Sequence, residues 1–282
     1  MKFDKLIRAL GPVVALAMAG GLSACDGNIS INGEKGQRLA ELDMSGAAPD
    51  ELVLAGPDEV RLTQGDKLAI TVEGDASVTD ELRFSLKDGT LGVMREGKMF
   101  NSDSDGHAIV NVTMPAPRTL TMAGSGKIRA PALQKAATVT IAGSGDIETT
   151  AIAADSLDLT IAGSGGYRAG GNVGRLKLTI AGSGNAAMDT LKVETAELTI
   201  AGSGSAGFAS DGTVKATIMG SGSVTVRGRA KCTVEAMGSG KLNCEAGPAT
   251  APSAEASPAP PTAPAAPAAP ETPEAPEAPK AP

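Results

Sequence analysis

The segment that ends at Gly106 holds the side chains most suggestive of metal-binding chemistry. Asn101, Asp103 and Asp105, followed by Gly106, match the first half of an EF-hand calcium loop in type and spacing. The twelfth position of such a loop needs a bidentate glutamate, but this chain has Val112 there, and no helical pattern flanks the segment. We therefore interpret the segment as a solvated loop and predict that the protein has no metal ion or other cofactor.

His107 is the only histidine of the chain. Nucleophilic catalysis needs a base held against the nucleophile, and no pattern in the sequence pairs His107 with one. Glycoside-cleaving enzymes use paired carboxylates instead, but no acidic residue recurs at a constant position in the repeats described below. The sequence therefore predicts that the protein is not an enzyme.

Cys25 follows a segment with the features of an export signal. Three basic residues precede an apolar run, Ala9 to Leu22, that is shorter than the about 20 residues of a membrane-spanning helix. The ending Leu22-Ser23-Ala24-Cys25 resembles the lipobox of bacterial lipoproteins, in which the cysteine becomes the lipidated first residue. We predict a lipoprotein signal peptide at residues 1–24 and lipidation of Cys25. The alternative is an ordinary signal peptide with an incidental cysteine.

Cys232 and Cys244 are the other two cysteines. An exported protein enters an oxidising environment in which they can pair. Counting from the nearest glycine triplet places Cys232 at the position of Val214 and Cys244 at the position of Val226, both on the apolar side of a strand. We predict a disulfide that closes the last coil, with two buried free thiols as the alternative.

Gly-Ser-Gly occurs seven times at intervals of 18 to 20 residues, and this period predicts a fold before it predicts a chemistry. Alternating apolar strands such as Val139-Thr140-Ile141 and Leu159-Thr160-Ile161 precede the triplets. A propeller blade needs about 40 residues, whereas 19 residues at ~3.3 Å each make a perimeter on the order of 60 Å, enough for three short strands. We predict an all-β protein, a parallel β-helix or solenoid of about seven rungs. The triplets begin at Gly124, Gly143, Gly163, Gly182, Gly202, Gly220 and Gly238.

Equivalent positions of successive rungs are expected to stack about 4.8 Å apart. Such stacking predicts an interior ladder of Ile141, Ile161, Ile180, Ile200 and Ile218. It also predicts a seam of glycine, either because both triplet glycines point inward where walls approach or because the backbone turns there with a positive φ. A phosphate loop is excluded because no helix follows the triplets. The residue after each triplet varies, so we expect this strip to be the first place to look for a ligand: Lys127, Asp146, Gly166, Asn185, Ser205, Ser223 and Lys241.

Less regular strands precede the repeats. Period-two alternation predicts them at residues 52–54, 60–62, 68–72, 82–86 and 109–112. At the other end, residues 247–282 contain 12 of the 18 prolines and are predicted to be a disordered tail or, alternatively, a spacer along the cell wall. The predicted organisation is a leader at 1–24, a linker at 25–44, a β-helix domain at 45–246 with N-terminal strands at 45–115 and repeats at 116–246, and a tail at 247–282.

The charge of the chain excludes one class of partner. Removal of residues 1–24 takes away three of the 25 Lys and Arg and one of the 32 Asp and Glu, which changes the formal net charge from −7 to −9. An acidic chain with 2% aromatic residues has neither a positive field nor stacking platforms for bases. We therefore predict that nucleic acid is not a partner.

The triplet followed by a variable and an apolar residue, as in Gly143-Ser144-Gly145-Asp146-Ile147, resembles the head GIN domain family of auto-transporter adhesins, also called DUF2807. The strands at Val60–Gln64, Leu68–Gly74 and Leu82–Leu91 resemble the amino-terminal part of that family, so the resemblance covers about Leu42 to Glu245. It implies a right-handed β-helix on an exported and often lipid-anchored protein. It also implies a role in adhesion and supplies no catalytic residues.

These observations together predict a non-enzymatic protein of the bacterial cell envelope that faces the periplasm or the cell surface and acts as an adhesin or scaffold. The expected partners are the membrane, through the lipid anchor, and an envelope glycan, peptidoglycan or protein. The alternative is a β-helix that binds or degrades a polysaccharide. The sequence leaves the choice between inner and outer membrane and the oligomeric state open.

Overall fold

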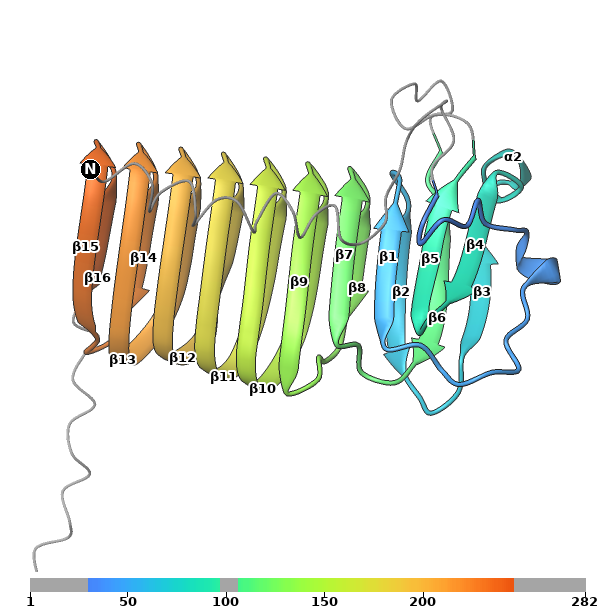
Figure 1. Ribbon diagram of the computed structural model, residues 1–282, viewed down its shortest axis with the longest axis horizontal. Helices are drawn as coiled ribbons and strands as arrows, with labels where there is room; N and C mark the ends of the chain where they lie inside the picture. Colours follow the sequence, from blue (N-terminus) through green and yellow to red (C-terminus); the bar gives the residue numbers. More distant parts are fainter. Residues whose placement is uncertain (1–29, 97–105, 246–282) are drawn as a thin grey trace, which may run out of the picture. The chain divides into compact units, whose positions relative to one another are not determined.

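The computed structural model describes residues 30–96 and 106–245, which form a parallel β-solenoid of stacked coils, here called rungs (Figure 1). The predicted leader, Cys25, the tail and three loop residues, Asn101, Asp103 and Asp105, lie outside the described residues. The predicted all-β solenoid is confirmed. Its elements are η1 (Leu39–Glu41), β1 (Glu51–Ala55), β2 (Glu59–Gln64), β3 (Ala69–Glu73), α2 (Ala76–Thr79), β4 (Leu82–Lys87), β5 (Thr90–Arg95), β6 (Ile109–Met114), β7 (Thr119–Gly124), β8 (Lys127–Ala130), β9 (Ala136–Gly143), β10 (Asp146–Gly163), β11 (Gly166–Gly182), β12 (Asn185–Gly202), β13 (Ser205–Gly220), β14 (Ser223–Arg227), β15 (Lys231–Gly238) and β16 (Lys241–Glu245).

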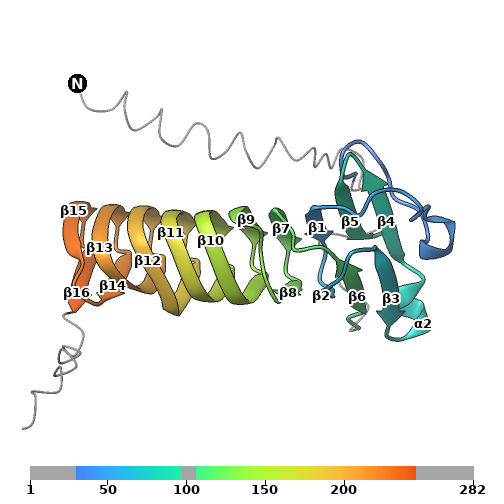
Figure 2. The ribbon, with the colours of Figure 1, turned by 90° about the horizontal axis from the view of Figure 1, so that it is seen from below.

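The middle rungs have three segments each, as the length of the repeat predicts. Residues 146–149, 152–154 and 156–163 of β10 pair in parallel with the matching segments of β11, with one irregularity after Thr149. The same pattern continues from β11 to β12. Figure 2 shows these coils from below, with β9 to β13 following one another along the stack.

The interior of the stack is mainly aliphatic. The predicted isoleucine ladder is confirmed, because all five residues from Ile141 to Ile218 are fully buried and Ile161 pairs directly with Ile180 in the next rung. Tyr167 and Phe208 are fully buried aromatic exceptions in the repeats, and the hydroxyl of Tyr167 donates a hydrogen bond to Oγ1 of Thr149 at 3.3 Å. Alternation of inward aliphatic and outward polar residues therefore builds the core.

The two glycines of each triplet are needed for different reasons. The first glycine has a positive φ, between 116° and 128° in the seven copies, which side chains rarely tolerate. The second glycine is buried against the rung before it: a Cβ on Gly204 would lie 2.5 Å from Cγ2 of Ile180 and 2.8 Å from the carbonyl oxygen of Gly184. The predicted turn with positive φ is confirmed for the first glycine. The prediction that opposite walls approach at the triplet is wrong, because the second glycine is instead packed against the preceding rung.

The N-terminal strands extend the same stack, but not in chain order. β1 lies between β7 and β5, and β2 lies between β8 and β6, with all four pairings parallel. The rung made of β5 and β6 is therefore further from the repeats than the rung made of β1 and β2. Beyond it, β4 runs antiparallel to β5 and β3 antiparallel to β6, and these two strands are the outermost at the N-terminal end.

Candidate functional site

In the segment with calcium-loop spacing, the described residues Gly106 and Val112 make structural contacts and do not form a metal site. The carbonyl oxygen of Gly106 accepts hydrogen bonds from the guanidinium of Arg95 at 3.2 and 3.3 Å. Val112 is fully buried and pairs with Leu62 of β2. His107 is exposed and forms no ion pair with any other described residue. The described part of this segment therefore brings no catalytic partner to the histidine.

The ion pair between Asp58 and Arg95 is the most buried one among the described residues, and the sequence did not reveal it. The two side chains are 1% and 9% exposed and hydrogen-bond to each other, with Nε of Arg95 3.2 Å from Oδ2 of Asp58. Oδ1 of Asp58 also accepts a hydrogen bond from the backbone N–H of Ala108 at 2.9 Å. The pair thus ties the β1–β2 corner to the end of β5 and the start of β6, and it is closed to a ligand.

The corner that carries Asp58 occupies the position of a triplet in its rung, although its sequence differs. Ala55 pairs with Ala123 and Glu59 pairs with Lys127, so residues 56–58 stack on Gly124-Ser125-Gly126. Gly56 keeps the positive φ of the first glycine, and Asp58 takes the place of the second. A glycine between two alternating apolar segments is the sequence signal that could have identified this rung.

A shallow groove with a volume of about 1210 Å³ follows the corner between the second and third segments of the rungs. Its lining carries both signs of charge, including Asp155, Arg175, Lys192, Glu194 and Asp211. The backbone N–H of Arg229 donates to Oδ1 of Asp211 at 2.9 Å, and this hydrogen bond lowers the pKa of that carboxyl below its usual value. A general acid needs a raised pKa, so the geometry at Asp211 favours polar contact over acid catalysis.

The glycine triplets form an uncharged, regular surface that we call the triplet edge. Backbone hydrogen bonds keep the triplets in line: the N–H of Ser183 donates to the carbonyl oxygen of Gly163 at 2.9 Å, and the N–H of Ser164 donates to that of Gly143 at 2.9 Å. All seven serine side chains are exposed, and their hydroxyls make no hydrogen bond to another described residue. The serines are Ser125, Ser144, Ser164, Ser183, Ser203, Ser221 and Ser239.

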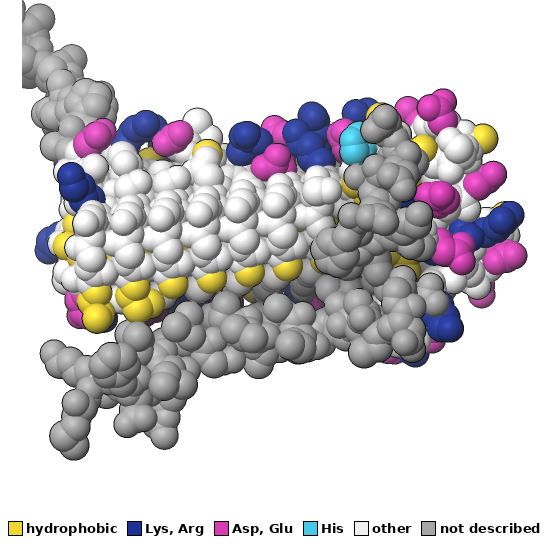
Figure 3. All heavy atoms as spheres, turned by 90° about the horizontal axis from the view of Figure 1, so that it is seen from above, with side chains coloured by type: hydrophobic (Ala, Val, Ile, Leu, Met, Phe, Trp, Pro, Cys, Tyr) yellow, Lys and Arg dark blue, Asp and Glu magenta, His cyan; other side chains and the backbone are white. Residues whose placement is uncertain are grey.

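Different side chains border the triplet edge on its two sides (Figure 3). Figure 3 shows a band of backbone and polar atoms with a row of hydrophobic side chains along one side and charged side chains along the other. The residue before each triplet is also apolar and forms one column, with alanine from Ala123 to Ala201 and then Met219 and Met237. The variable strip predicted on the other side is one column, because Asp146 pairs with Gly166 and Gly166 with Asn185.

A threonine column lies two residues before the alanines. Thr140 pairs with Thr160, and Thr160 pairs with Thr179. Hydroxyl and methyl groups thus repeat along this face at the ~4.8 Å spacing of paired strands. The column contains Thr121, Thr140, Thr160, Thr179, Thr199 and Thr217.

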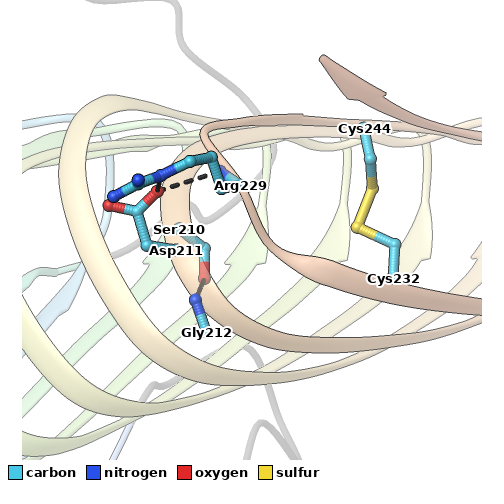
Figure 4. The surroundings of a disulfide bond; sticks show 6 residues. All are labelled: Ser210, Asp211, Gly212, Arg229, Cys232 and Cys244. Carbon is cyan, nitrogen blue, oxygen red and sulfur yellow. Dashed lines mark hydrogen bonds and ion pairs between the residues drawn. A yellow bond between two sulfur atoms is a disulfide. The ribbon is translucent and has the colours of Figure 1, made fainter. Parts of the chain in front are cut away.

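Cys232 and Cys244 lie in the last rung and are joined by a disulfide in the structure (Figure 4). Their Cα atoms are 6.7 Å apart, and Cys232 pairs with Val214 while Cys244 pairs with Val226, the positions expected from the repeat phase. Figure 4 also shows Arg229 reaching toward Asp211 at the neighbouring corner. The cysteines thus link the two faces of the terminal coil.

Two further searches concern metals and membranes. Within residues 30–96 and 106–245, no three His, Cys, Asp or Glu side chains gather closely enough to hold a metal ion. Over the same residues, the structure has no helix with the length and apolar character to cross a bilayer.

Comparison with known families identifies a match over most of the folded region. Residues 48–230 match the family model DUF2807, described as "Putative auto-transporter adhesin, head GIN domain". A search of curated proteins found no match to the chain.

Three solved structures share the fold at low sequence identity. A "putative adhesin" from Bacteroides fragilis NCTC 9343 has a TM-score of 0.61 and 17% identity, with 70% of this chain and 93% of that chain covered. A "putative lipid binding protein" from Parabacteroides distasonis ATCC 8503 has a TM-score of 0.55 and 22% identity, over 71% and 93%. A "putative adhesin" from the same strain has a TM-score of 0.55 and 20% identity, over 71% and 94%. None of the three descriptions names an enzymatic activity.

Proposed function

The chain belongs to the DUF2807 family of head GIN domains, and from this premise we propose that it is a non-enzymatic adhesin or scaffold of the bacterial cell envelope. In this proposal a lipid on Cys25 holds the protein to a membrane, and the triplet edge binds a glycan of the envelope. The family description supports a role in adhesion, and the lipobox-like sequence before Cys25 supports the anchor.

The regularity of the triplet edge carries the proposal. A glycan chain presents hydroxyl groups at regular intervals, and the edge offers exposed serine hydroxyls in every triplet with no internal partner among the described residues. Each contact is weak, but linked contacts raise the overall affinity because later ones form at high effective concentration. Hydrogen bonds would carry the recognition, since the chain has no Trp, one Tyr and four Phe for stacking on sugar rings.

Binding is favoured over degradation of the same glycan. Hydrolysis requires an acid and a second carboxylate on either side of the scissile bond. In the groove, the lowered pKa of Asp211 favours its ionised form, and the triplet edge itself consists of Gly and Ser. Turnover of a defined polysaccharide by the purified protein, abolished by one carboxylate substitution, would contradict the proposal.

The binding surface can be tested with two matched double variants. Ser164→Glu with Ser183→Glu adds two charges to the triplet edge, and Ala153→Glu with Asn172→Glu adds two charges to exposed, paired positions at the groove of the same rungs. We expect the serine variant to lose at least tenfold in cosedimentation with purified peptidoglycan or envelope polysaccharide, and the control to bind as wild type. Loss in the control alone would place the site in the groove.

The anchor has an independent test. Cys25→Ala removes the thiol that lipidation requires, so we expect the protein to leave the membrane fraction when cells are fractionated. An unchanged membrane fraction would show that another segment holds it there. Parallel sedimentation with phospholipid vesicles would show whether the folded domain binds lipid directly.

A further inference from the structure

The C-terminal end of the solenoid presents free strand edges. β15 pairs only with β13 and β16 only with β14 among the described strands, so the second edge of each has no strand beside it. Val234 is 45% exposed, although Ala216, its counterpart one rung inward, is fully buried. Met237 is 64% exposed. Free edges of this kind pair readily with another chain.

We propose that a second copy of this chain covers the end, and that the two terminal rungs meet about a two-fold axis passing through Thr233 and Asn243. This inference is independent of the ligand proposed above. In such a pair, β15 lies antiparallel to β15 of the partner, and β16 lies antiparallel to β16 of the partner.

The disulfide supports the position of the axis. Cys232 lies across the rung from Cys244, with a Cα–Cα distance of 6.7 Å, and the chain turns between them through the last glycine triplet. The residue next to each cysteine on the side of that turn is Thr233 on one face and Asn243 on the other, so these two residues also lie across the rung from each other. One two-fold axis can therefore pass through both residues, and the resulting interface is isologous, with the same patch on each copy.

Charge complementarity selects this register. About Thr233, Lys231 lies opposite the partner's Glu235, and about Asn243, Lys241 lies opposite the partner's Glu245. All four side chains are exposed and form no ion pair with a described residue. A two-residue shift along β15 removes the match, because Lys231 then faces the partner's Met237 or Thr233. Opposite charges directly across two strands stabilise their pairing.

The apolar positions agree with the same register. Cys232 lies opposite the partner's Val234, and Leu242 lies opposite the partner's Cys244, so each aliphatic interior continues into the other. The competing occupant is the chain's own segment 247–282. Its 12 prolines lack the N–H that strand pairing needs, which favours the second copy.

Single cysteines at the axis test the geometry in the full chain. Thr233→Cys and Asn243→Cys each place a thiol at the axis, next to the same thiol of the second copy. A short bismaleimide joins such free thiols but leaves the native disulfide unreacted. We expect at least tenfold more cross-linked dimer than with Lys215→Cys and Thr225→Cys, which occupy the equivalent positions one rung inward. The parent chain accounts for any reaction at Cys25. Equal cross-linking at the end and one rung inward, or at only one of the two axis positions, would overturn the proposal.

Charge reversal tests the pairing without a new thiol. Lys231→Glu alone and Glu235→Lys alone each place like charges across the axis, so we expect the dimer fraction in sedimentation to fall at least fivefold for each variant. Mixing the two variants restores both opposite-charge pairs, and we expect the dimer to return as a heterodimer. Unchanged association of the single variants, or failure of the mixture to associate while both melt as wild type, would contradict the two-fold register.

Discussion

The two ends of the solenoid are finished by different means, although the rungs between them repeat almost unchanged. At the N-terminal end, β3 and β4 run antiparallel to the outermost rung, and the buried Asp58–Arg95 pair holds its corner. At the C-terminal end, β15 and β16 keep a free edge, and a disulfide joins the two faces. A solenoid can be lengthened by copying one rung, but ending it requires chemistry that the repeat does not contain.

The ion pairs at the N-terminal end and in the repeats differ in burial. Asp58 and Arg95 are almost completely buried, whereas Asp189 and Arg227, 2.8 Å apart, are each about half exposed. Removing one partner of a buried pair leaves an uncompensated charge, but an exposed charge can be solvated by water. Loss of one partner should therefore cost more at the buried Asp58–Arg95 pair than at the exposed Asp189–Arg227 pair.

The largest predicted effect comes from breaking the buried pair. Asp58→Ala leaves the Arg95 charge without its carboxylate and the Ala108 N–H without its acceptor, so we expect the free energy of unfolding in urea to fall by about 3–5 kcal/mol. The control Asp189→Ala, at the exposed pair, should cost less than about 1 kcal/mol. Equal losses in the two variants would show that burial does not distinguish the regions.

Removal of the disulfide should affect the C-terminal end alone. Replacing Cys232 and Cys244 by Ser opens the loop that the disulfide closes. Cross-linking a loop of similar length contributes about 3 kcal/mol to stability, so we expect the local free energy of unfolding to fall by about 2–3 kcal/mol. Amide hydrogen exchange should become faster in β15 and β16 and stay unchanged in β10 to β12. Uniform acceleration along the chain would mean that the end and the middle unfold as one unit.

A side chain at the glycine seam tests the middle rungs. In Gly184→Val the new atoms run into Cγ2 of Ile161, with the carbonyl oxygen of Gly165 3.0 Å from the Cβ, so we expect overpacking to cost about 1–3 kcal/mol. Gly46→Val is the control, since no atom lies within 4 Å of its Cβ position. Unchanged thermal unfolding of Gly184→Val would argue against the seam.

The smallest effect concerns the one tyrosine in the aliphatic interior. Burial raises the pKa of Tyr167 above its ordinary value of 10.0. The unfolded chain releases this proton first as pH rises, so the stability contributed by neutral Tyr167 is present below about pH 10 and decreases above it.

Tyr167→Phe removes that titration and one hydrogen bond. At pH 8 we expect a loss of less than about 1 kcal/mol, and between pH 8 and pH 11 the urea midpoint should fall less than in the wild type. Parallel decreases in the two proteins would show that Tyr167 does not contribute to alkaline sensitivity.

The structure of the repeats was predictable because each rung has nearly the same sequence pattern as the next. The alternation around Ile161 and Ile180 indicates which residues face inward, and the constant period places them in register without knowledge of distant segments. The different steric roles of Gly182 and Gly184 could be recognised only in the structure. The two residues have the same type, but they differ in φ and in the atoms that surround them. The absence of a shared charged column was also visible in the sequence, and it made the carboxylates poor candidates for a common site.

The N-terminal half shows what sequence reasoning missed. Strands near β1, β2, β3, β4 and β6 were predicted, but β5 was recognised only at its first residues, and the outward placement of β5 and β6 was not expected. The corner at Gly56 lacks the Gly-Ser-Gly letters although it stacks on the first triplet. One-turn α2 was also outside the prediction, since four residues are too few to show a helical period.

The sequence by itself determined the period, the inward aliphatic ladder and the position of the glycine seam, because each depends on local alternation and on identical neighbours. Only the tertiary structure decided that β5 and β6 lie outside β1 and β2, that Asp58 meets Arg95, and that antiparallel strands end the stack on one side while parallel strands end it on the other. Those features arise from contacts between residues that are distant in the chain and unlike each other. Such contacts have no repeating pattern, so their partners are established only when the chain folds.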